Sequence, residues 1–193
     1  KTSNLCWIKH LPVELVYGDI TDKDSLNPAV KNIDYIYHIA GAIKGVSEEK
    51  FFSVNTEGTL HLAQAAQTHT PHLRRFVFVS SVAAKGPVPK TQKAIEDSPC
   101  YPVSSYGTSK LKAEILLKEM FPNLPLTIIR PPIVYGPRDK NFLAFFKCAK
   151  IGFFPKLPPK ERYYSIVYVK DLIEGIYAAS LSAIAHGQTY FIS

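Results

Sequence analysis

The sequence has no long hydrophobic run and no cluster of cysteines. No apolar stretch approaches the roughly 20 residues of a membrane-spanning helix, so we expect no membrane partner. The three cysteines, Cys6, Cys100 and Cys148, are far apart and odd in number. This spacing argues against a disulfide framework and against a thiolate metal site, and it favours a reducing, cytoplasmic compartment. The sequence therefore predicts neither a secreted disulfide-rich domain nor a metalloprotein.

Runs of like charge are missing as well. The formal net charge is +7 at pH 7, but no five consecutive residues carry the same charge. We therefore expect no nucleic-acid partner, because such surfaces concentrate their lysines and arginines. Scattered cations suit a solvated basic surface, or one that attracts an anionic cofactor or substrate.

What is present is an alternation of two kinds of segment within a chain of 193 residues, 46% hydrophobic, which is enough for one ordinary core. Strands are predicted at 13–19, 33–41, 74–81 and 124–137, and helices at 22–30, 47–69 and 105–120. Strand-helix-strand alternation predicts an α/β fold, with a parallel, doubly wound sheet covered by helices on both faces. Such sheets bind ligands beyond the carboxyl ends of their strands.

The predicted strand ends carry small or polar residues: "YGD" at 17–19, "HIAG" at 38–41, "VSSVAAKG" at 79–86 and "RPPIVYG" at 130–136. Ordinary turns also favour Gly, Asp and Pro, so most of these residues have a purely structural explanation. That explanation does not account for the pair Ser80-Ser81, followed about 25 residues later by a helix that opens with "SSYGTSK" at 104–110.

The spacing Tyr106-x-x-x-Lys110 is weak by itself, since this composition gives about one such spacing by chance. Its chemistry is coherent, however. An ammonium one turn away on the same helix face favours the phenolate form of a tyrosine, whose pKa is ordinarily about 10. A phenol tuned in this way exchanges a proton with a substrate alcohol or carbonyl. A serine at a neighbouring strand end, Ser81, can hold the same substrate oxygen while hydride passes to a nicotinamide.

Seven segments, in order, carry a resemblance to one family. They are "YGDITDKDSL", "DYIYHIAG", "VNTEGTLHL", "RRFVFVSS", "YGTSKLKAE", "IIRPPIVYGPRD" and "IVYVKDLIEGI". Together they span nearly the whole chain, which resembles the extended short-chain dehydrogenase/reductase family, also called the NAD-dependent epimerase/dehydratase family. The resemblance implies a Rossmann-like fold, NAD or NADP as cofactor, and hydride transfer on a small-molecule substrate. It also allows a homodimer, since relatives often dimerise through the helices after Asn55 and Tyr106.

The resemblance implies residue roles at the matching positions. The catalytic residues are Ser81, Tyr106 and Lys110, of which Tyr106 and Lys110 would also contact the cofactor. Further cofactor-binding residues are Asp19 and Ile20 near the adenine, His38, Ile39, Ala40 and Gly41 in a loop beside ribose and pyrophosphate, Asn55 behind the active site, and Pro131 and Ile133 beside the nicotinamide.

Several of these residues have a structural alternative. Asp19 can instead serve as a turn aspartate, His38 as a buried strand-end histidine, and Asn55 as a helix residue that bonds nearby backbone. Arg130 can simply pair with a carboxylate, and Lys85 is by default a surface lysine.

One departure from the family pattern stands out. The chain contains no Gly-x-Gly-x-x-Gly fingerprint, the loop that cradles a dinucleotide pyrophosphate. We therefore expect a piece of a longer protein, short of about one βαβ unit of ~30 residues at its N-terminal side. Residues 1–137 would form a partial NAD(P)-binding domain, and residues 138–193 would combine part of a small C-terminal substrate region with the last sheet elements. Because the fingerprint is missing, we expect weak cofactor binding and low activity from these residues alone.

The substrate and the function are left open between three interpretations. A nucleotide-sugar epimerase or dehydratase needs cations for a diphosphate, whereas a dihydroflavonol- or hydroxysteroid-type reductase needs an apolar pocket. The cations available are Lys140, Lys147 and Arg162, and the apolar residues are Phe142, Phe145, Phe146, Phe153 and Phe154. A non-catalytic NAD(P)-sensing regulator on the same fold is the third interpretation.

Overall fold

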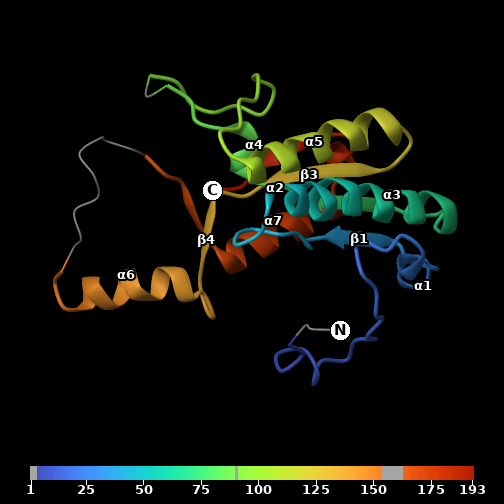
Figure 1. The fold of residues 1–193 in the computed structure, drawn as a ribbon, viewed down its shortest axis with the longest axis horizontal. Coiled ribbons are helices and arrows are strands. Elements are labelled where there is room, and N and C mark those ends of the chain that lie inside the picture. Colours follow the sequence, from blue (N-terminus) through green and yellow to red (C-terminus); the bar gives the residue numbers. More distant parts are fainter. Residues whose placement is uncertain (1–3, 90, 154–162) are drawn as a thin grey trace.

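A computed structural model of the protein describes residues 4–89, 91–153 and 163–193. Its centre is a parallel sheet of four strands in the order β1-β2-β3-β6, of which β1 and β3 are labelled in Figure 1. The strands are β1 (Tyr35–His38), β2 (Arg75–Val79), β3 (Leu126–Arg130) and β6 (Thr189–Phe191). In register, Ile36 lies opposite Phe76, which lies opposite Leu126, so the carboxyl ends of the strands share one edge.

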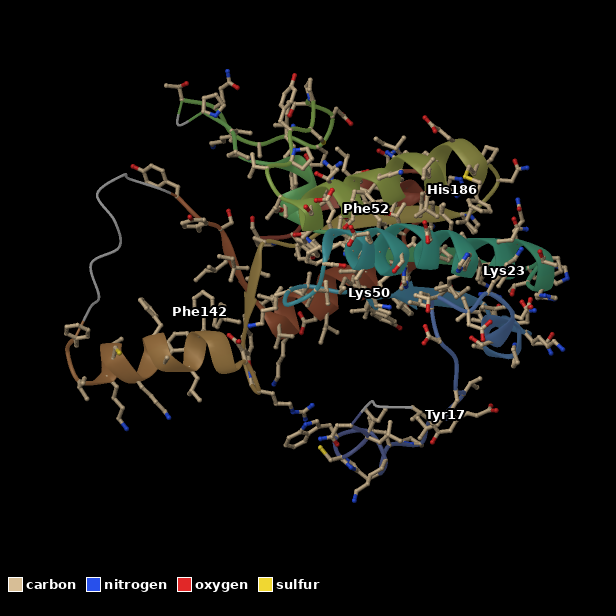
Figure 2. The ribbon with its side chains drawn as sticks, in the orientation of Figure 1. Tyr17, Lys23, Lys50, Phe52, Phe142 and His186 are labelled. Carbon is tan, nitrogen blue, oxygen red and sulfur yellow. The ribbon has the colours of Figure 1, made fainter. Side chains whose placement is uncertain are left out.

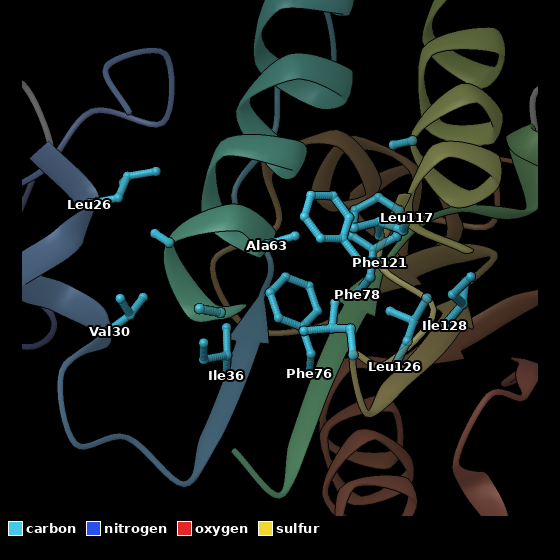
Figure 3. Packing of buried hydrophobic residues seen from close by; sticks show 14 residues of the cluster. Leu26, Val30, Ile36, Ala63, Phe76, Phe78, Leu117, Phe121, Leu126 and Ile128 are labelled. Carbon is cyan, nitrogen blue, oxygen red and sulfur yellow. The ribbon is translucent and has the colours of Figure 1, made fainter. Parts of the chain in front are cut away.

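Helices cover both faces of this sheet, as the alternation of segments predicts. Along β2, Phe76 and Phe78 face one way and Val77 the other, because successive strand residues point to opposite faces. The helices on the first face are α1 (Asn27–Val30), α3 (Gly58–His69) and α5 (Ser105–Met120), whose core is seen in Figure 3. Helix α7 (Val169–Leu181) covers the second face through Leu172 and Ile176. The fold is therefore Rossmann-like and doubly wound.

The strand predicted at 13–19 is wrong. This segment joins no sheet of the described chain, and all its side chains are exposed, including Tyr17 at 70% (Figure 2). Apolar residues favour a strand only where their backbone groups find a ladder partner, and within the described residues β1 is an end strand whose one partner is β2. The segment after it folds as expected: the short helix η1 (Asp24–Leu26) runs into α1, with Pro28 in the first turn.

The predicted helix at 47–69 is present but not uniform. Ser47 caps its start by accepting a hydrogen bond from the Lys50 amide at 3.3 Å. The helix then passes through α2 (Glu48–Phe51), a π-helical segment η2 (Phe52–Glu57) and α3. The π-helical segment turns both Asn55 and Thr56 into the interior, where they are 0% and 2% exposed. Such segments often mark functional sites.

Helix α5 matches its predicted bounds, but its buried face is not its apolar one. Ile115 and Met120, on the apolar side, are 45% and 56% exposed, although an amphipathic helix ordinarily buries that side. The buried residues are Gly107, Ser109, Lys110, Ala113, Glu114 and Leu117. Small residues lie here because the short helix α4 (Val82–Lys85) packs directly against the start of α5.

Gly107 is the point of closest approach between α4 and α5. A Cβ placed there would lie 2.3 Å from the Ala83 carbonyl oxygen. We therefore expect Gly107→Ala to lower the free energy of unfolding by about 1–3 kcal/mol, because backbone must move to make room. Denaturant titration with and without the change measures this. Gly175→Ala on α7 is the matched control, since its Cβ meets only the flexible end of Ile192, and an equal loss in both variants would contradict the explanation.

The predicted strand at 124–137 is divided by its prolines. β3 stops at Arg130, and after Pro131 and Pro132 the chain forms β4 (Ile133–Tyr135), which pairs in parallel with β5 (Ile166–Tyr168) in a second, small sheet. Helix α6 (Lys140–Lys150) then extends as an arm beside the main layers (Figure 1). A 3-10 turn, η3 (Ala183–Ala185), precedes β6. The division of the chain at residue 137 stays a prediction. Within the described residues, no helix is long and apolar enough to cross a membrane.

Candidate active site

Ser81 lies directly after β2 and begins helix α4. Its extended backbone makes it the N-cap, and its hydroxyl accepts a hydrogen bond from the Ala83 amide at 3.1 Å. The same side chain lies close enough to the Tyr106 phenol on α5 to lower the pKa of that group. The neighbouring Val82 amide donates to the Pro131 carbonyl at 3.0 Å, so the proline that follows β3 adjoins the serine that follows β2.

Tyr106 is in the first turn of α5. Ser104 caps this helix by accepting from the Gly107 amide at 3.1 Å, and the Tyr106 ring packs 6.0 Å from the Phe51 ring. Burial raises the pKa of the Tyr106 phenol above its ordinary value, because the charged form loses solvation. The Ser81 side chain acts in the opposite direction and lowers this pKa.

Lys110 lies one turn further along α5 and points at the carboxyl end of β2. Its ammonium donates to the Val79 carbonyl at 3.0 Å and lies 4.8 Å from the centre of the Phe78 ring. Burial lowers the pKa of Lys110 to about 8, against the opposite pull of the Glu114 carboxylate. In this structure burial dominates and raises the pKa of Tyr106, and the Lys110 ammonium donates to strand β2. The expected lowering of the Tyr106 pKa by Lys110 stays a prediction.

Asn55 holds the loop after β1 against helix α5. Its side-chain oxygen accepts from the Ala42 amide at 2.8 Å, and its amide nitrogen donates to the Ala42 carbonyl at 3.0 Å and to the Ser109 hydroxyl at 3.1 Å. Gly41 fits tightly between them, since a Cβ there would lie 3.0 Å from the Asn55 oxygen and 3.3 Å from the Lys110 nitrogen. Ile39 and Ala40 precede this contact on an exposed part of the loop.

His38, the last residue of β1, is 2% exposed. Its Nε2 lies 2.8 Å from the Thr59 hydroxyl, which donates its own proton to the Asn55 carbonyl. Nε2 must therefore carry the ring proton, and the imidazole stacks on Phe78 with centroids 5.5 Å apart. Burial first, and then the charge of Lys110, lowers the pKa of His38 to about 3, so the ring is neutral near pH 7.

Asp19 and Ile20 lie beside the helix that follows the π-helical segment. Asp19 Oδ1 accepts from the Thr21 amide at 2.9 Å and the Thr21 hydroxyl at 2.7 Å, which is the turn role weighed as its alternative. Ile20 fills the space over Gly58, where a Cβ would lie 2.7 Å from its Cγ1. An adenine contact for either residue stays a prediction, as do the cofactor roles of the half-exposed Ile133 and the buried Pro131.

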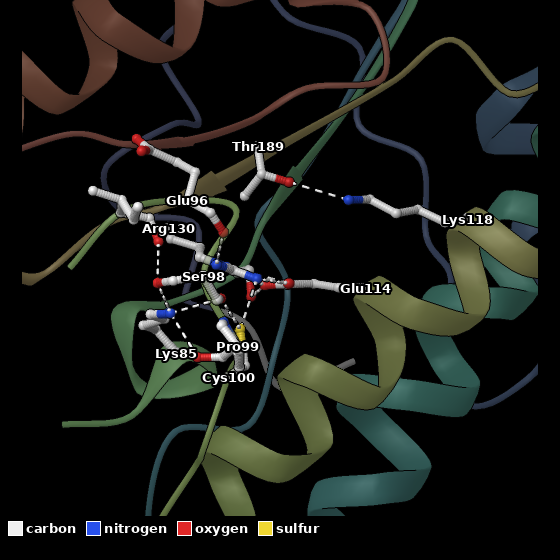
Figure 4. A network of polar contacts seen from close by, with 11 residues as sticks. Lys85, Glu96, Ser98, Pro99, Cys100, Glu114, Lys118, Arg130 and Thr189 are labelled. Atoms are coloured by element: carbon white, nitrogen blue, oxygen red, sulfur yellow. Dashed lines mark hydrogen bonds and ion pairs between the residues drawn. The ribbon is translucent and has the colours of Figure 1, made fainter. Parts of the chain in front are cut away.

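Sequence reasoning missed a buried polar layer behind the site (Figure 4). Arg130 pairs with the Glu114 carboxylate at 2.6 Å, so its expected carboxylate partner is confirmed. Lys85, expected at the surface, is 3% exposed and donates to the carbonyls of Ser98 and Pro99 at 2.7 and 2.6 Å. Its interior place follows from these acceptors, which compensate for the loss of solvent. A signal was available: Lys110 and Glu114 have helical spacing on the face that carries Gly107.

Ser81, Tyr106 and Lys110 thus lie near the carboxyl edge of a parallel, doubly wound sheet. The family model for the NAD dependent epimerase/dehydratase family matches residues 1–193, and the chain belongs to that family.

Individual proteins similar to this chain carry out different reactions. It is 31% identical to the ceramide reductase of Caulobacter vibrioides over 84% of the chain and 45% of that protein. It is 30% identical to N-acetyl-alpha-D-glucosaminyl-diphospho-ditrans,octacis-undecaprenol 4-epimerase of Escherichia coli O157:H7, over 82% of the chain and 49% of the relative. UDP-glucuronic acid 4-epimerase from Bacillus cereus, solved with UDP-glucuronic acid and NAD, is 26% identical with a TM-score of 0.78, covering 91% of the chain and 58% of that structure. The chain thus spans about half the length of the relatives it matches.

Proposed function

We propose that the whole protein is an NAD-dependent oxidoreductase or epimerase that acts on a hydroxyl or carbonyl carbon of a nucleotide-sugar by hydride transfer. The observation that carries this is that the Ser81 side chain, at the start of α4, interacts with the Tyr106 phenol on α5, with Lys110 one turn further along the same helix. This places two hydroxyls together at the sheet edge where such folds bind their ligands.

In the proposed reaction, Ser81 and Tyr106 hold the same substrate oxygen. When the substrate alcohol is oxidised, its hydroxyl proton passes to the Tyr106 oxygen and its carbon loses a hydride, which bound NAD accepts. Reduction runs through the same groups, with Tyr106 giving its proton to the carbonyl oxygen. Because burial favours the neutral phenol, Tyr106 starts as the acid, and the Ser81 side chain favours the ionised form needed for the reverse direction.

The residues present fit one end of a dinucleotide. Gly41, after the carboxyl end of β1, approaches Asn55 and Lys110 so closely that a side chain would not fit there, which leaves bare backbone. Pro131 adjoins Ser81. Lys110, Tyr106, the 38–41 loop and residues 131–133 would hold the nicotinamide and its ribose. No Gly-rich turn for the pyrophosphate occurs in the sequence.

The 193-residue chain alone is accordingly expected to bind NAD weakly. Backbone amides at a Gly-rich helix start ordinarily supply the pyrophosphate contacts, and these contacts are lost without that turn. Isothermal titration with NAD, on this chain and on the full-length protein, measures the difference. Tight, saturable binding by the chain alone would contradict this expectation, as would equal affinities of the two proteins.

Substrate class is tested on the full-length protein with NAD bound. UDP-sugars are offered in one assay and, in parallel, ketones with an apolar body together with reduced cofactor. An epimerase converts one sugar into its isomer without net change in nicotinamide absorbance, whereas a reductase consumes the reduced cofactor. The nucleotide-sugar assignment is supported by the UDP-glucuronic acid bound to the Bacillus cereus relative. Conversion of the apolar ketones alone would replace it with the reductase function.

An aromatic cluster favours that second function. On the arm formed by β4, β5 and α6, Tyr135 lies 6.0 Å from Phe146 and 5.5 Å from Tyr168, and Phe142 lies 6.2 Å from Phe146, between ring centroids (Figure 2). Phe145 and Phe146 are 44% and 48% exposed, a surface suited to an apolar substrate body. Of the residues named above for either substrate, Arg162, Phe154 and the Lys140 side chain lie outside the described residues.

A cofactor-sensing regulator without catalysis remains the alternative of another class. A regulator needs no proton exchange, so its biological effect would survive the loss of the Tyr106 hydroxyl. The activity of the proposed enzyme would not survive this loss. For the proposed enzyme we also infer dimerisation through α3 and α5 and a cytoplasmic location. The exposed apolar residues Ile115 and Met120 on α5 and the free Cys6, Cys100 and Cys148 support them.

A further inference from the structure

Glu114 is a carboxylate in the interior that the proposed reaction does not use. It is 3% exposed and lies on α5, one helical turn beyond Lys110. Burying a charged carboxylate costs several kcal/mol, on the order of a protein's whole stability, unless partners compensate. Its contacts therefore indicate what its place in the fold provides.

Those contacts reach two strand ends. The Arg130 guanidinium donates twice, from Nε at 3.1 Å and from Nη2 at 2.6 Å, and the Ser80 hydroxyl donates to the same carboxylate (Figure 4). Ser80 immediately precedes Ser81, and Arg130 immediately precedes Pro131. One side chain of α5 thus holds the ends of both β2 and β3.

Glu114 also acts on Lys110 through charge. Residues four apart share a helix face, and the carboxylate favours the ammonium form of Lys110, raising its pKa where burial lowers it. The other titratable groups near Lys110 are Tyr106 on its own helix and His38 on β1, which is neutral; Arg130 on β3 is paired with the carboxylate. Within the described residues, Glu114 is the carboxylate one turn away on the same helix face whose charge acts on this ammonium.

We propose that Glu114 is a positioning residue: its carboxylate fixes the helix carrying Tyr106 and Lys110 against the strand ends carrying Ser81 and Pro131, and supplies the countercharge of the Lys110 ammonium. The catalytic meaning of this inference rests on the proposed function. The contacts that carry it are independent of any substrate or cofactor.

The test is the titration of Lys110 itself in the full-length protein, followed by NMR with lysine labelled at Cε. A Lys110→Arg sample identifies the signal. Glu114→Gln keeps size and some hydrogen bonding but removes the charge, and it is expected to move the Lys110 midpoint downward by about one pH unit or more. Glu119→Gln makes the same chemical change on the exposed part of α5 and should leave the midpoint unchanged.

A second variant separates positioning from mere stability. Glu114→Gln leaves the buried Arg130 charge without its partner and is expected to lower the melting temperature. Glu114→Gln combined with Arg130→Met removes both charges and should recover much of the lost melting temperature. Loss of the Arg130 cation would by itself raise the pKa of Lys110, so a midpoint that still lies below wild type isolates the carboxylate. A Lys110 midpoint that does not move in the single Glu114→Gln variant would overturn the inference.

The titration needs neither NAD nor substrate. An unchanged Lys110 midpoint therefore rejects the role of Glu114 without touching the proposed function. If the proposed function is wrong, the wild-type protein shows no turnover in the assays above, while Glu114→Gln still shifts the Lys110 midpoint.

Discussion

Tyr106→Phe is expected to reduce turnover of the full-length protein by about 10²- to 10⁴-fold, the range that a positioned acid-base group contributes. The change removes one oxygen and leaves the ring, so the packing against Phe51 at 6.0 Å should survive. What is lost is the group that exchanges a proton with the substrate oxygen, together with its interaction with Ser81. The measurement is kcat with saturating NAD and substrate.

Tyr101→Phe is the matched control for this change. Tyr101 precedes the same helix but is 69% exposed, so removing its hydroxyl should leave kcat unchanged. Circular dichroism and NAD affinity establish that both variants are folded and loaded. Full turnover by the Tyr106 variant would reject the enzymatic function and revive the regulator; a loss shared equally with the Tyr101 variant would reject the assigned role of Tyr106.

A second large effect is expected from acid. The pKa of His38 is about 3 in the folded protein and 6.5 ordinarily, so between these values the unfolded chain binds a proton that the folded chain does not. Stability from this group is therefore complete above pH 6.5 and declines as the pH falls toward 3. At about 1.4 kcal/mol per unit, the loss is on the order of 4–5 kcal/mol.

Denaturant titrations at a series of pH values measure this loss. His38→Gln retains a donor for the Thr59 hydroxyl but cannot titrate, so its unfolding free energy should depend less steeply on pH over this window than that of the wild type. His72→Gln, at an exposed position, should keep the wild-type dependence. Parallel curves for wild type and His38→Gln would show that the histidine is accommodated as a cation after all.

Local pattern was enough to predict much of the fold. The run at 74–81 is apolar on both faces because β2 is buried on both, and the bounds of α5 follow from its Ser104 cap and its periodicity. The same reasoning failed at 13–19, where the residues suit a strand but the described chain offers no neighbouring strand. Pairing is a property of the whole sheet and cannot be inferred from one segment.

Sequence pattern places the residues of the candidate site, but it does not give their electrostatics. Tyr106 and Lys110 are placed by helical spacing, whereas the pKa of Tyr106 depends on burial that only packing reveals. The inward-facing polar residues Glu114 and Ser109 were missed for a related reason. A pattern search seeks apolar residues on the buried face, but here most of that face consists of small or hydrogen-bonded side chains, with Leu117 as its one large apolar residue.

The π-helical turn at Phe52–Glu57 has a consequence for how this helix can vary. Two adjacent side chains of an ordinary α-helix diverge by about 100°, yet Asn55 and Thr56 both reach Ser109, one to its hydroxyl and one to its carbonyl. The widened turn makes this double grip possible. Deleting a single residue there would restore regular α-helical winding and turn either Asn55 or Thr56 away from α5. We therefore expect this turn to tolerate substitutions far better than insertions or deletions.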